Sequence, residues 1–224
     1  KGEYWTDKAM TNCGFSGPWF ELKGSYRIPA ALRPLLVLFA RTFIPKEKRV
    51  ETDEPQDSFF DIVEGPCKLR WVQTTEEKAV EVCVNEVLNL APSAAPSSLP
   101  VSDITFLGGS KQACVPIINR LEGKYEVIHT FSSEGKALER KKKLSFYRGD
   151  ARVKVTTLHS YKGMENRALV IFLSKNRISP SLVYTGLSRL KRSETDEGGS
   201  YLTVVCTSNK YLDYAQNWPE FEQL

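Results

Sequence analysis

Side chains suited to phosphate chemistry are concentrated in three short segments of this 224-residue sequence. Residues 157–165 read TLHSYKGME, residues 182–192 read LVYTGLSRLKR, and residues 24–29 read GSYRIP. Hydroxyl and imidazole groups donate hydrogen bonds to phosphate oxygens without reading a base sequence. A carboxylate accepts hydrogen bonds from two hydroxyls, and a guanidinium stabilises the negative charge that develops during phosphoryl transfer. The three segments therefore hold the candidate functional residues.

The sequence lacks the motifs of a self-sufficient enzyme. No Gly-x-x-x-x-Gly-Lys-Ser/Thr loop is present to cradle a nucleoside triphosphate. Residues 108–111 read GGSK after an apolar run, but no glycine precedes the lysine, so we interpret them as a turn and a helix N-cap. There is also no His-Glu-x-x-His, no Gly-x-Ser-x-Gly and no paired-cysteine redox motif. A complete active site is therefore hard to assemble from this chain alone.

Cysteine and histidine do not form a metal-ligand pattern. The five cysteines fit neither a disulfide framework nor a zinc ribbon, and they indicate separate reduced thiols in a cytosolic protein. They are Cys13, Cys67, Cys83, Cys114 and Cys206. Only His129 and His159 occur, so no histidine-built metal site is expected, and we interpret His129, which no motif surrounds, as structural.

The net charge of +4 is unevenly distributed. Residues 51–64 hold six acids and no base, whereas residues 136–154 hold eight bases against two acids. The two stretches are either solvated surfaces, or the basic one faces a polyanion with Phe146 and Tyr147 available for base stacking. The longest apolar run, residues 35–40, is too short to span a bilayer, so we expect no membrane partner.

Four short apolar runs rich in β-branched residues predict buried strands. They cover residues 104–107, 153–158, 169–173 and 202–206. Because these runs are apolar on both faces and do not alternate with polar residues, they indicate a central parallel sheet that helices cover.

Helical patterns lie between these runs. Thr74 followed by Glu77 predicts a capping box. The apolar positions that follow fall on one side of a helix: Ala79, Val80, Cys83, Val87 and Leu90. A second helix is predicted between Ser110 and Gly123, where Pro116 should kink it or delay its start.

Together these elements predict an open, mainly parallel α/β sheet with helices on both faces. A third helix is predicted over residues 182–192, and residues 24–29 open another. Residues 91–100 and 51–66 are predicted to be loops. Functional loops of such sheets lie beyond the carboxyl ends of the strands, which singles out the loop after residues 153–158.

The three chemistry-bearing segments, in their order along the chain, resemble motifs IV, V and VI of superfamily I helicases of the UvrD/Rep/PcrA type. Residues 157–165 are similar to the family's Thr-Ile-His-x-x-Lys-Gly-Leu-Glu. Residues 184–191 resemble its Tyr-Val-Ala-Leu-Thr-Arg-Ala-Lys, and residues 25–28 read Ser-Tyr-Arg-Ile where the family favours Asn-Tyr-Arg-Ser. The resemblance spans roughly residues 20–210 and corresponds to the second RecA-like domain of such a helicase.

The resemblance implies that residues 1–224 form one RecA-like domain. ATP and Mg²⁺ would then be held mainly by an N-terminal RecA-like domain of the same protein, upstream of Lys1. We also expect a piece of a longer chain because Lys1 stands first and methionine occurs only at positions 10 and 164. Many relatives carry a large helical insertion where this chain has only the basic connection 136–152, so the auxiliary domain is expected to be absent or reduced.

The resemblance also assigns roles to nucleotide-binding residues. Arg189 and Arg27 would reach the γ-phosphate as arginine fingers, and Glu165 would contact the nucleotide ribose. Gly163 would allow the turn before Glu165 to take a backbone conformation closed to other residues. The alternatives are surface ion pairs for the two arginines, and a pairing of Glu165 with Arg167 or Lys162.

Thr157 and His159 match the residues of the family that touch a single strand. Tyr161 or Lys162 would add contacts, and the sequence does not choose between them. The alternative for His159 is a buried imidazole that bonds to a backbone carbonyl.

The sequence therefore predicts the second motor domain of a cytoplasmic, ATP-dependent helicase or translocase, inactive without its P-loop domain. Its nucleic-acid partner would be single-stranded DNA, with RNA as the alternative. A helicase-like docking module that does not hydrolyse ATP is the second hypothesis. The presence of both Arg27 and Arg189 favours the motor, and a nuclease after Leu224 is a third option.

Overall fold

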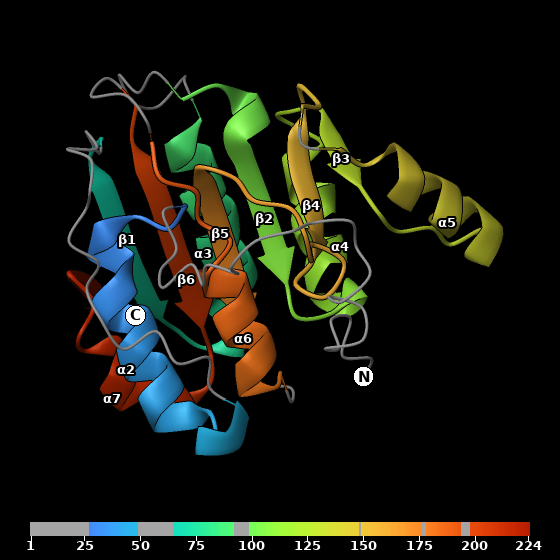
Figure 1. The fold of residues 1–224 in the computed structure, drawn as a ribbon. Coiled ribbons are helices and arrows are strands. Elements are labelled where there is room, and N and C mark those ends of the chain that lie inside the picture. Colours follow the sequence, from blue (N-terminus) through green and yellow to red (C-terminus); the bar gives the residue numbers. More distant parts are fainter. Residues whose placement is uncertain (1–26, 49–64, 92–98, 148, 176–177, 194–197) are drawn as a thin grey trace, which may run out of the picture.

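A seven-stranded sheet runs through the described part of the chain in this computed structural model, and all its strand pairs are parallel (Figure 1). The structure describes residues 27–48, 65–91, 99–147, 149–175, 178–193 and 198–224. The strand order is β3-β4-β2-β5-β6-β1-β7. The strands are β1 (Cys67–Gln73), β2 (Ile104–Gly108), β3 (Val127–His129), β4 (Val153–Thr157), β5 (Ala168–Leu173), β6 (Ser200–Cys206) and β7 (Glu220–Gln223).

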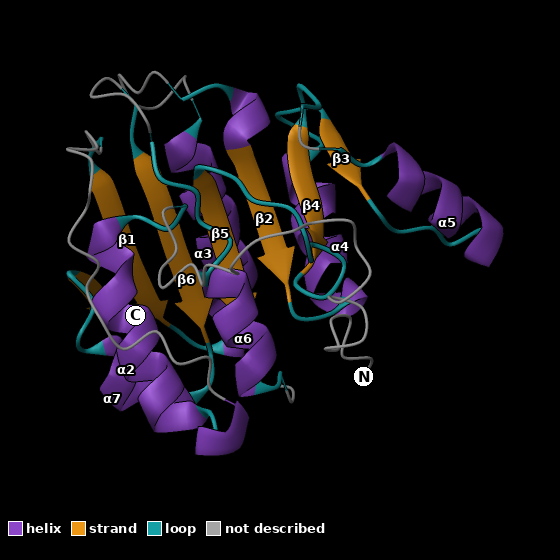
Figure 2. Ribbon diagram, viewed as in Figure 1, coloured by secondary structure: helices purple, strands orange, loops and turns teal. Residues whose placement is uncertain are grey.

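Helices cover both faces of the sheet (Figure 2). They are α2 (Arg33–Phe43), α3 (Glu76–Leu90), α4 (Lys111–Leu121), α5 (Lys136–Ser145), α6 (Pro180–Leu187) and α7 (Leu212–Ala215), with 3-10 turns at Ala30–Leu32, Lys46–Lys48, Val101–Asp103 and Asn209–Tyr211. Helices α2, α6 and α7 pack on one face, and α3 and α4 on the other, which gives two hydrophobic clusters. None of the helices in the described ranges is both long and apolar enough to cross a membrane.

The predicted open parallel α/β sheet with helices on both faces is confirmed. The runs 104–107, 153–158, 169–173 and 202–206 form β2, β4, β5 and β6. Every residue of β2 and β5 is buried, as expected of strands that helices cover on both sides. The sequence pattern missed β1, because Lys68 and Arg70 interrupt its apolar positions, and it missed the short strands β3 and β7.

Two predicted helix starts have different outcomes. Ser110 is the N-cap of α4, where its hydroxyl accepts from the Ala113 amide at 3.2 Å, so the predicted turn and N-cap are confirmed. The helix begins at Lys111, so Pro116 lies inside it and does not delay its start.

The capping box predicted at Thr74 is wrong by one residue. Thr75 is the N-cap of α3, because the Thr74 amide donates to the Cys206 carbonyl beside the end of β1.

The predicted apolar side of α3 is largely confirmed. Ala79, Cys83 and Val87 are buried against the sheet, and Val84 joins them in place of Val80 and Leu90, which are partly exposed. Val84 follows Val80 by one helical turn, so the two side chains lie on the same side of the helix.

The predicted helix over residues 182–192 is wrong at both ends. Helix α6 begins earlier, at Pro180, because Ser179 caps it and a proline suits the first helical position. It ends at Leu187, and the amides of Arg189 and Leu190 then bond to Gly186 and Leu187 in tight turns. Arg189 therefore lies beyond the helix.

The basic stretch contains a helix, α5, where a connection was expected. The acidic residues 51–64, Cys13, residues 24–26 and most of the predicted loop 91–100 lie outside the described residues. The four described cysteines are free thiols: Cys67, Cys83, Cys114 and Cys206.

Candidate functional site

The connection between β4 and β5 carries most of the predicted site, and it returns along the sheet without a helix (Figure 1). Both strands pair with β2: Thr157 stands opposite Gly108 at the carboxyl end of β2, and Ala168 stands opposite Ile104 at its amino end. At about 3.3 Å per residue, these ends lie roughly 13 Å apart. The connection therefore divides the predicted residues between two opposite edges of the sheet.

Thr157 and His159 lie at the carboxyl edge, in the loop that the sequence singled out. The Thr157 hydroxyl accepts from the Ser160 amide at 3.2 Å and lies 3.1 Å from the Ser160 hydroxyl. Thr157 thus already holds the first turn of the connection. His159 is exposed, so the alternative of a buried histidine is wrong.

The other members of this loop differ in accessibility. Tyr161 is buried in the core and Lys162 is exposed, so of these two only Lys162 can reach a partner in solution. Gly163 is also exposed and has φ +86°, a left-handed conformation that glycine adopts without strain. The predicted need for glycine at this turn is confirmed.

Glu165 and Arg27 meet at the amino edge. The Arg27 Nε atom lies 3.1 Å from Glu165 Oε2, and both side chains are partly exposed. Arg27 Nη2 also donates to the Ser188 carbonyl at 3.5 Å. Of the alternatives, the pairing of Glu165 with Arg167 is wrong, because Arg167 pairs with Asp103.

Arg189 lies close to this pair. Its Nε atom is buried and makes no hydrogen bond to any described residue. Burial lowers the pKa of the Arg189 guanidinium, and the nearby Arg27 cation lowers that pKa further. The negative charge of Glu165 acts in the opposite direction. Arginine stays protonated in proteins, so the described part of the cluster contains two cations and one carboxylate.

Asn166 positions the cluster, and sequence reasoning missed it. The backbone N–H of Asn166 donates to the Arg189 backbone carbonyl at 3.2 Å. The backbone carbonyl of Asn166 accepts from the Lys191 backbone N–H at 2.8 Å. The buried Asn166 side chain donates to the Thr105 hydroxyl at 3.0 Å. Asn166 therefore ties the backbone beside Glu165 to the backbone of Arg189. A polar amide two residues before the apolar run 168–173 was the available signal.

The aromatic residues of the basic stretch behave differently from one another. Phe146 is 5% exposed and packs in the core, so the expectation that it stacks on bases is wrong. Tyr147 is 58% exposed.

His129, at the end of β3, stacks on Phe131, and its Nδ1 accepts from the Phe131 amide at 3.3 Å, which fits its interpretation as structural.

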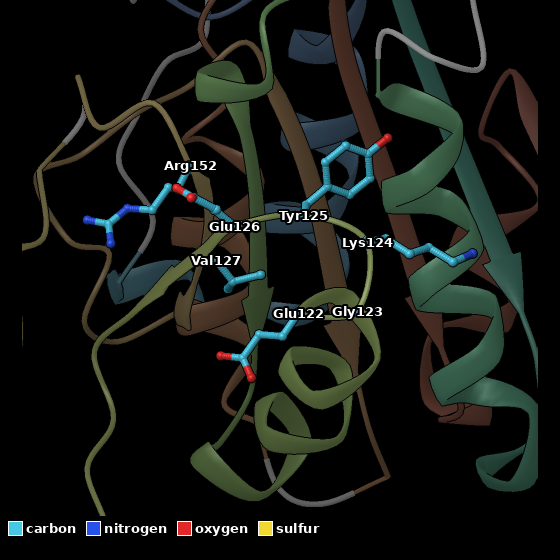
Figure 3. Close-up of a pocket in the computed structure, with 7 residues that line it drawn as sticks. All are labelled: Glu122, Gly123, Lys124, Tyr125, Glu126, Val127 and Arg152. Carbon is cyan, nitrogen blue, oxygen red and sulfur yellow. The ribbon is translucent and has the colours of Figure 1, made fainter.

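One hollow on the described surface lies away from the predicted residues. It measures about 570 Å³ and is lined by Glu122, Gly123, Lys124, Tyr125, Glu126, Val127 and Arg152. Figure 3 shows that the charged ends of Glu122, Lys124 and Arg152 point in different directions. The hollow therefore presents no converging set of ligand groups.

No metal-ligand cluster is present in the described ranges either, because nowhere in them do three metal-ligating side chains gather.

No protein-family model matches the sequence, and a search of curated proteins gives no match. Solved structures of similar shape include the C-terminal domain of a possible DNA helicase from Lactobacillus plantarum WCFS1. It has 16% identity and a TM-score of 0.47, and the match covers 82% of this chain and 88% of that one.

Two further solved structures are DEAD-box proteins. For the protein from Methanococcus jannaschii the identity is 13% and the TM-score 0.44, over 70% of this chain and 42% of that chain. For E. coli SrmB, bound to the regulator of ribonuclease activity A, the identity is 11% and the TM-score 0.40, over 72% and 91%. At such values the likeness establishes neither a family nor a shared site.

Proposed function

We propose that this chain is the second, RecA-like motor domain of an ATP-dependent nucleic-acid helicase or translocase of superfamily I. The observation that carries the proposal is the convergence of Arg27, Glu165 and Arg189 at one edge of the sheet. The sequence motifs single out these residues from three separate segments. A chance surface ion pair would not require a third, partly buried guanidinium beside it.

The cluster fits an anion such as the terminal phosphate of ATP. The Arg189 Nε atom is a buried donor without a hydrogen-bond partner among the described residues, and buried donors are normally satisfied. Arg189 and Arg27 would hold the γ-phosphate, and bound ATP would supply the phosphoryl group that is transferred to water. The guanidinium charge would stabilise the negative charge that builds up on the phosphate oxygens.

The proposed roles of Arg27 and Glu165 exclude one another while the two side chains are paired. The γ-phosphate and the ribose of a nucleotide are separated by two further phosphates, so one ion pair cannot occupy both positions. We infer that nucleotide binding opens the pair, which sends Arg27 to the phosphate and Glu165 to the ribose. ATP and Mg²⁺ would be held mainly by the N-terminal RecA-like domain of the complete protein.

The carboxyl edge would contact single-stranded DNA, or RNA as the alternative. His159 is exposed and able to donate to a phosphate. The Thr157 hydroxyl is engaged with Ser160, so its contribution would be the shape of the turn unless the strand displaces Ser160. Phosphate contacts of this kind hold a strand without reading its sequence, as translocation requires.

A docking module that does not hydrolyse ATP is the second candidate. The Arg27–Glu165 pair favours it, because the two opposite charges balance one another without a ligand. The deciding experiment measures ATP hydrolysis by the complete protein, with and without single-stranded DNA. Turnover that the oligonucleotide stimulates supports the motor. Binding of the strand without any ATP turnover would contradict the motor hypothesis and support the docking module.

A further inference from the structure

Helix α5 projects away from the sheet at the β3 edge (Figure 1). None of its described residues is buried. Only Leu138, Glu139 and Lys142 are even partly covered, and they form the stripe that faces the body of the protein. A ten-residue helix gains little from its own hydrogen bonds in water, and most helices depend on tertiary packing. The helix therefore offers nearly its whole circumference to a partner.

The charge on α5 is strongly positive. Five of its ten residues are cations and one is an acid: Lys136, Arg140, Lys141, Lys142, Lys143 and Glu139. The acid is engaged within the helix, because Glu139 pairs with Lys143 at 2.7 Å. In the part of the chain that the structure describes, no carboxylate pairs with Lys136, Arg140 or Lys141. Such a surface attracts a polyanion.

The cations are arranged along the helix. Lys136, Arg140 and Lys143 stand at i, i+4 and i+7, which places them in one row about 10 Å long. Lys141 lies beside this row. A row of charges fits a partner with regularly repeated negative charge, and a phosphodiester backbone is such a partner.

An exposed aromatic ring follows the helix. Tyr147 is 58% exposed, whereas its neighbour Phe146 is 5% exposed and anchors the segment in the core. The ring of Tyr147 is thus held close to the cations of α5. Aromatic rings beside a positively charged track are stacking platforms for unpaired bases. An acidic peptide would bind to the cations, but it has no bases to stack on this ring.

Helix α5 follows strand β3, whose carboxyl end lies at the same edge of the sheet as the loop of Thr157 and His159. Strand β3 pairs with β4, so His129 at the carboxyl end of β3 stands opposite Val155, two residues before Thr157. Burial lowers the pKa of His129, and the charges of Lys142 and Lys111 lower it further, while Glu122 raises it. Lys142 of α5 and Lys111 of α4 therefore both lie near the carboxyl end of β3.

We propose that α5 and Tyr147 form a second contact for single-stranded nucleic acid, with the cations on the backbone and the Tyr147 ring on an unpaired base. The proposal rests on the proposed function only for the class of partner. It adds a second site, distinct from the β4–β5 loop and independent of the nucleotide cluster.

The test measures binding of a fluorescent thymidine homopolymer to the chain at several salt concentrations. One variant is Lys136→Gln/Arg140→Gln/Lys141→Gln, in which glutamine keeps a high helix propensity. The matched control, Lys78→Gln/Arg120→Gln/Lys124→Gln, removes three exposed cations from α3, α4 and the turn that follows α4. A second pair compares Tyr147→Ala with Tyr147→Phe, which keeps a ring.

The α5 variant should bind more weakly and lose about 2 from the slope of log affinity against log salt, at about 0.7 per phosphate contact. The matched control should leave that slope unchanged. Tyr147→Ala should weaken binding roughly tenfold, in line with the loss of one stacked base, and Tyr147→Phe should not. Thermal melting of each variant checks that the fold is intact.

Four results would overturn the proposal: no binding by the parent chain, an unchanged slope in the α5 variant, an equal loss in the matched control, or displacement of the oligonucleotide by polyglutamate at equal charge concentration. None of these results depends on ATP turnover. Loss of hydrolysis in the complete protein, with α5 binding intact, would instead count against the motor alone.

Discussion

The Arg27 Nε atom lies 3.1 Å from Glu165 Oε2, so the segment that leads into α2 is fastened to the connection between β4 and β5. This ion pair joins two residues that the sequence motifs assign to different parts of a nucleotide. Arg189, whose buried Nε has no hydrogen-bond partner in the described part of the chain, stands beside the pair. The arrangement therefore engages Arg27 with a carboxylate and keeps a second guanidinium, that of Arg189, beside it.

Breaking the pair should cost little stability. Both side chains are partly exposed, and ion pairs of this kind contribute about 0–1 kcal/mol. We expect Arg27→Gln, Glu165→Gln and the double variant to change the free energy of unfolding by about that amount. Urea denaturation of the four proteins gives the coupling energy directly. A coupling well above this range would mean that the pair is a structural anchor, and the proposed opening by nucleotide would lose its basis.

The elements apolar on both faces were predictable from the sequence, and so was the conformation of Gly163. Strand β1 was not, because Lys68 and Arg70 lie among its apolar residues. The end of α6 was misjudged because Leu190 continues the apolar spacing, although it is buried through the bridge between residues 166 and 190. Helical spacing alone does not distinguish a helix from turns that bury the same side chain.

The membership of the site was predicted from motifs, but its contacts were not. Arg27 and Glu165 are far apart in the sequence, and no local pattern indicates that they pair. Asn166 was missed for the same reason, since its partners Thr105 and Arg189 are brought to it only by the order of the strands. Such contacts depend on the tertiary fold.

Removing the Asn166 side chain should destabilise the protein. The buried amide donates to the Thr105 hydroxyl, and its Oδ1 accepts from the Arg167 amide at 3.2 Å. Asn166→Ala leaves these groups without their partner, which costs about 1–3 kcal/mol. Asn85→Ala, an exposed asparagine of α3, should change stability far less. Equal effects of the two substitutions in urea denaturation would contradict the positioning role that we assign to Asn166.

Gly163 should not tolerate a side chain. Its φ of +86° lies in the left-handed region, although nothing lies within 4 Å of the position where a Cβ would stand. Gly163→Ala is therefore expected to destabilise the fold by roughly 1 kcal/mol through backbone strain alone. Gly123→Ala is the control, because Gly123 has no positive φ and a Cβ there would meet only the Arg120 carbonyl at 4.0 Å. A more stable Gly163→Ala variant would contradict the described turn.

The ion pair before β4 should make stability depend on pH. Asp150 accepts from Arg152 Nε at 2.8 Å and Nη2 at 2.7 Å, and this pairing lowers the pKa of Asp150 from 3.8 to about 2. The folded pKa lies below the ordinary value, so the contribution is present above about pH 4 and is lost as the pH falls through about 2. Because Arg152 is partly exposed, we expect on the order of 1 kcal/mol.

Urea denaturation between neutral and acidic pH checks this expectation. Asp150→Asn should flatten the acid limb of the stability curve, whereas Asp213→Asn, at an exposed aspartate, should keep the parental curve. The assignment to Asp150 fails if both variants follow the parent throughout.

Turnover of ATP by the complete protein carrying Arg189→Ala tests the central claim most directly. The guanidinium is expected to act on the transition state, so kcat should fall about a thousandfold or more, while the affinity for single-stranded DNA is kept. Arg120→Ala, an exposed arginine of α4, should hydrolyse ATP at the parental rate. If Arg189→Ala also hydrolyses ATP at the parental rate, Arg189 is not an arginine finger and the motor assignment is contradicted.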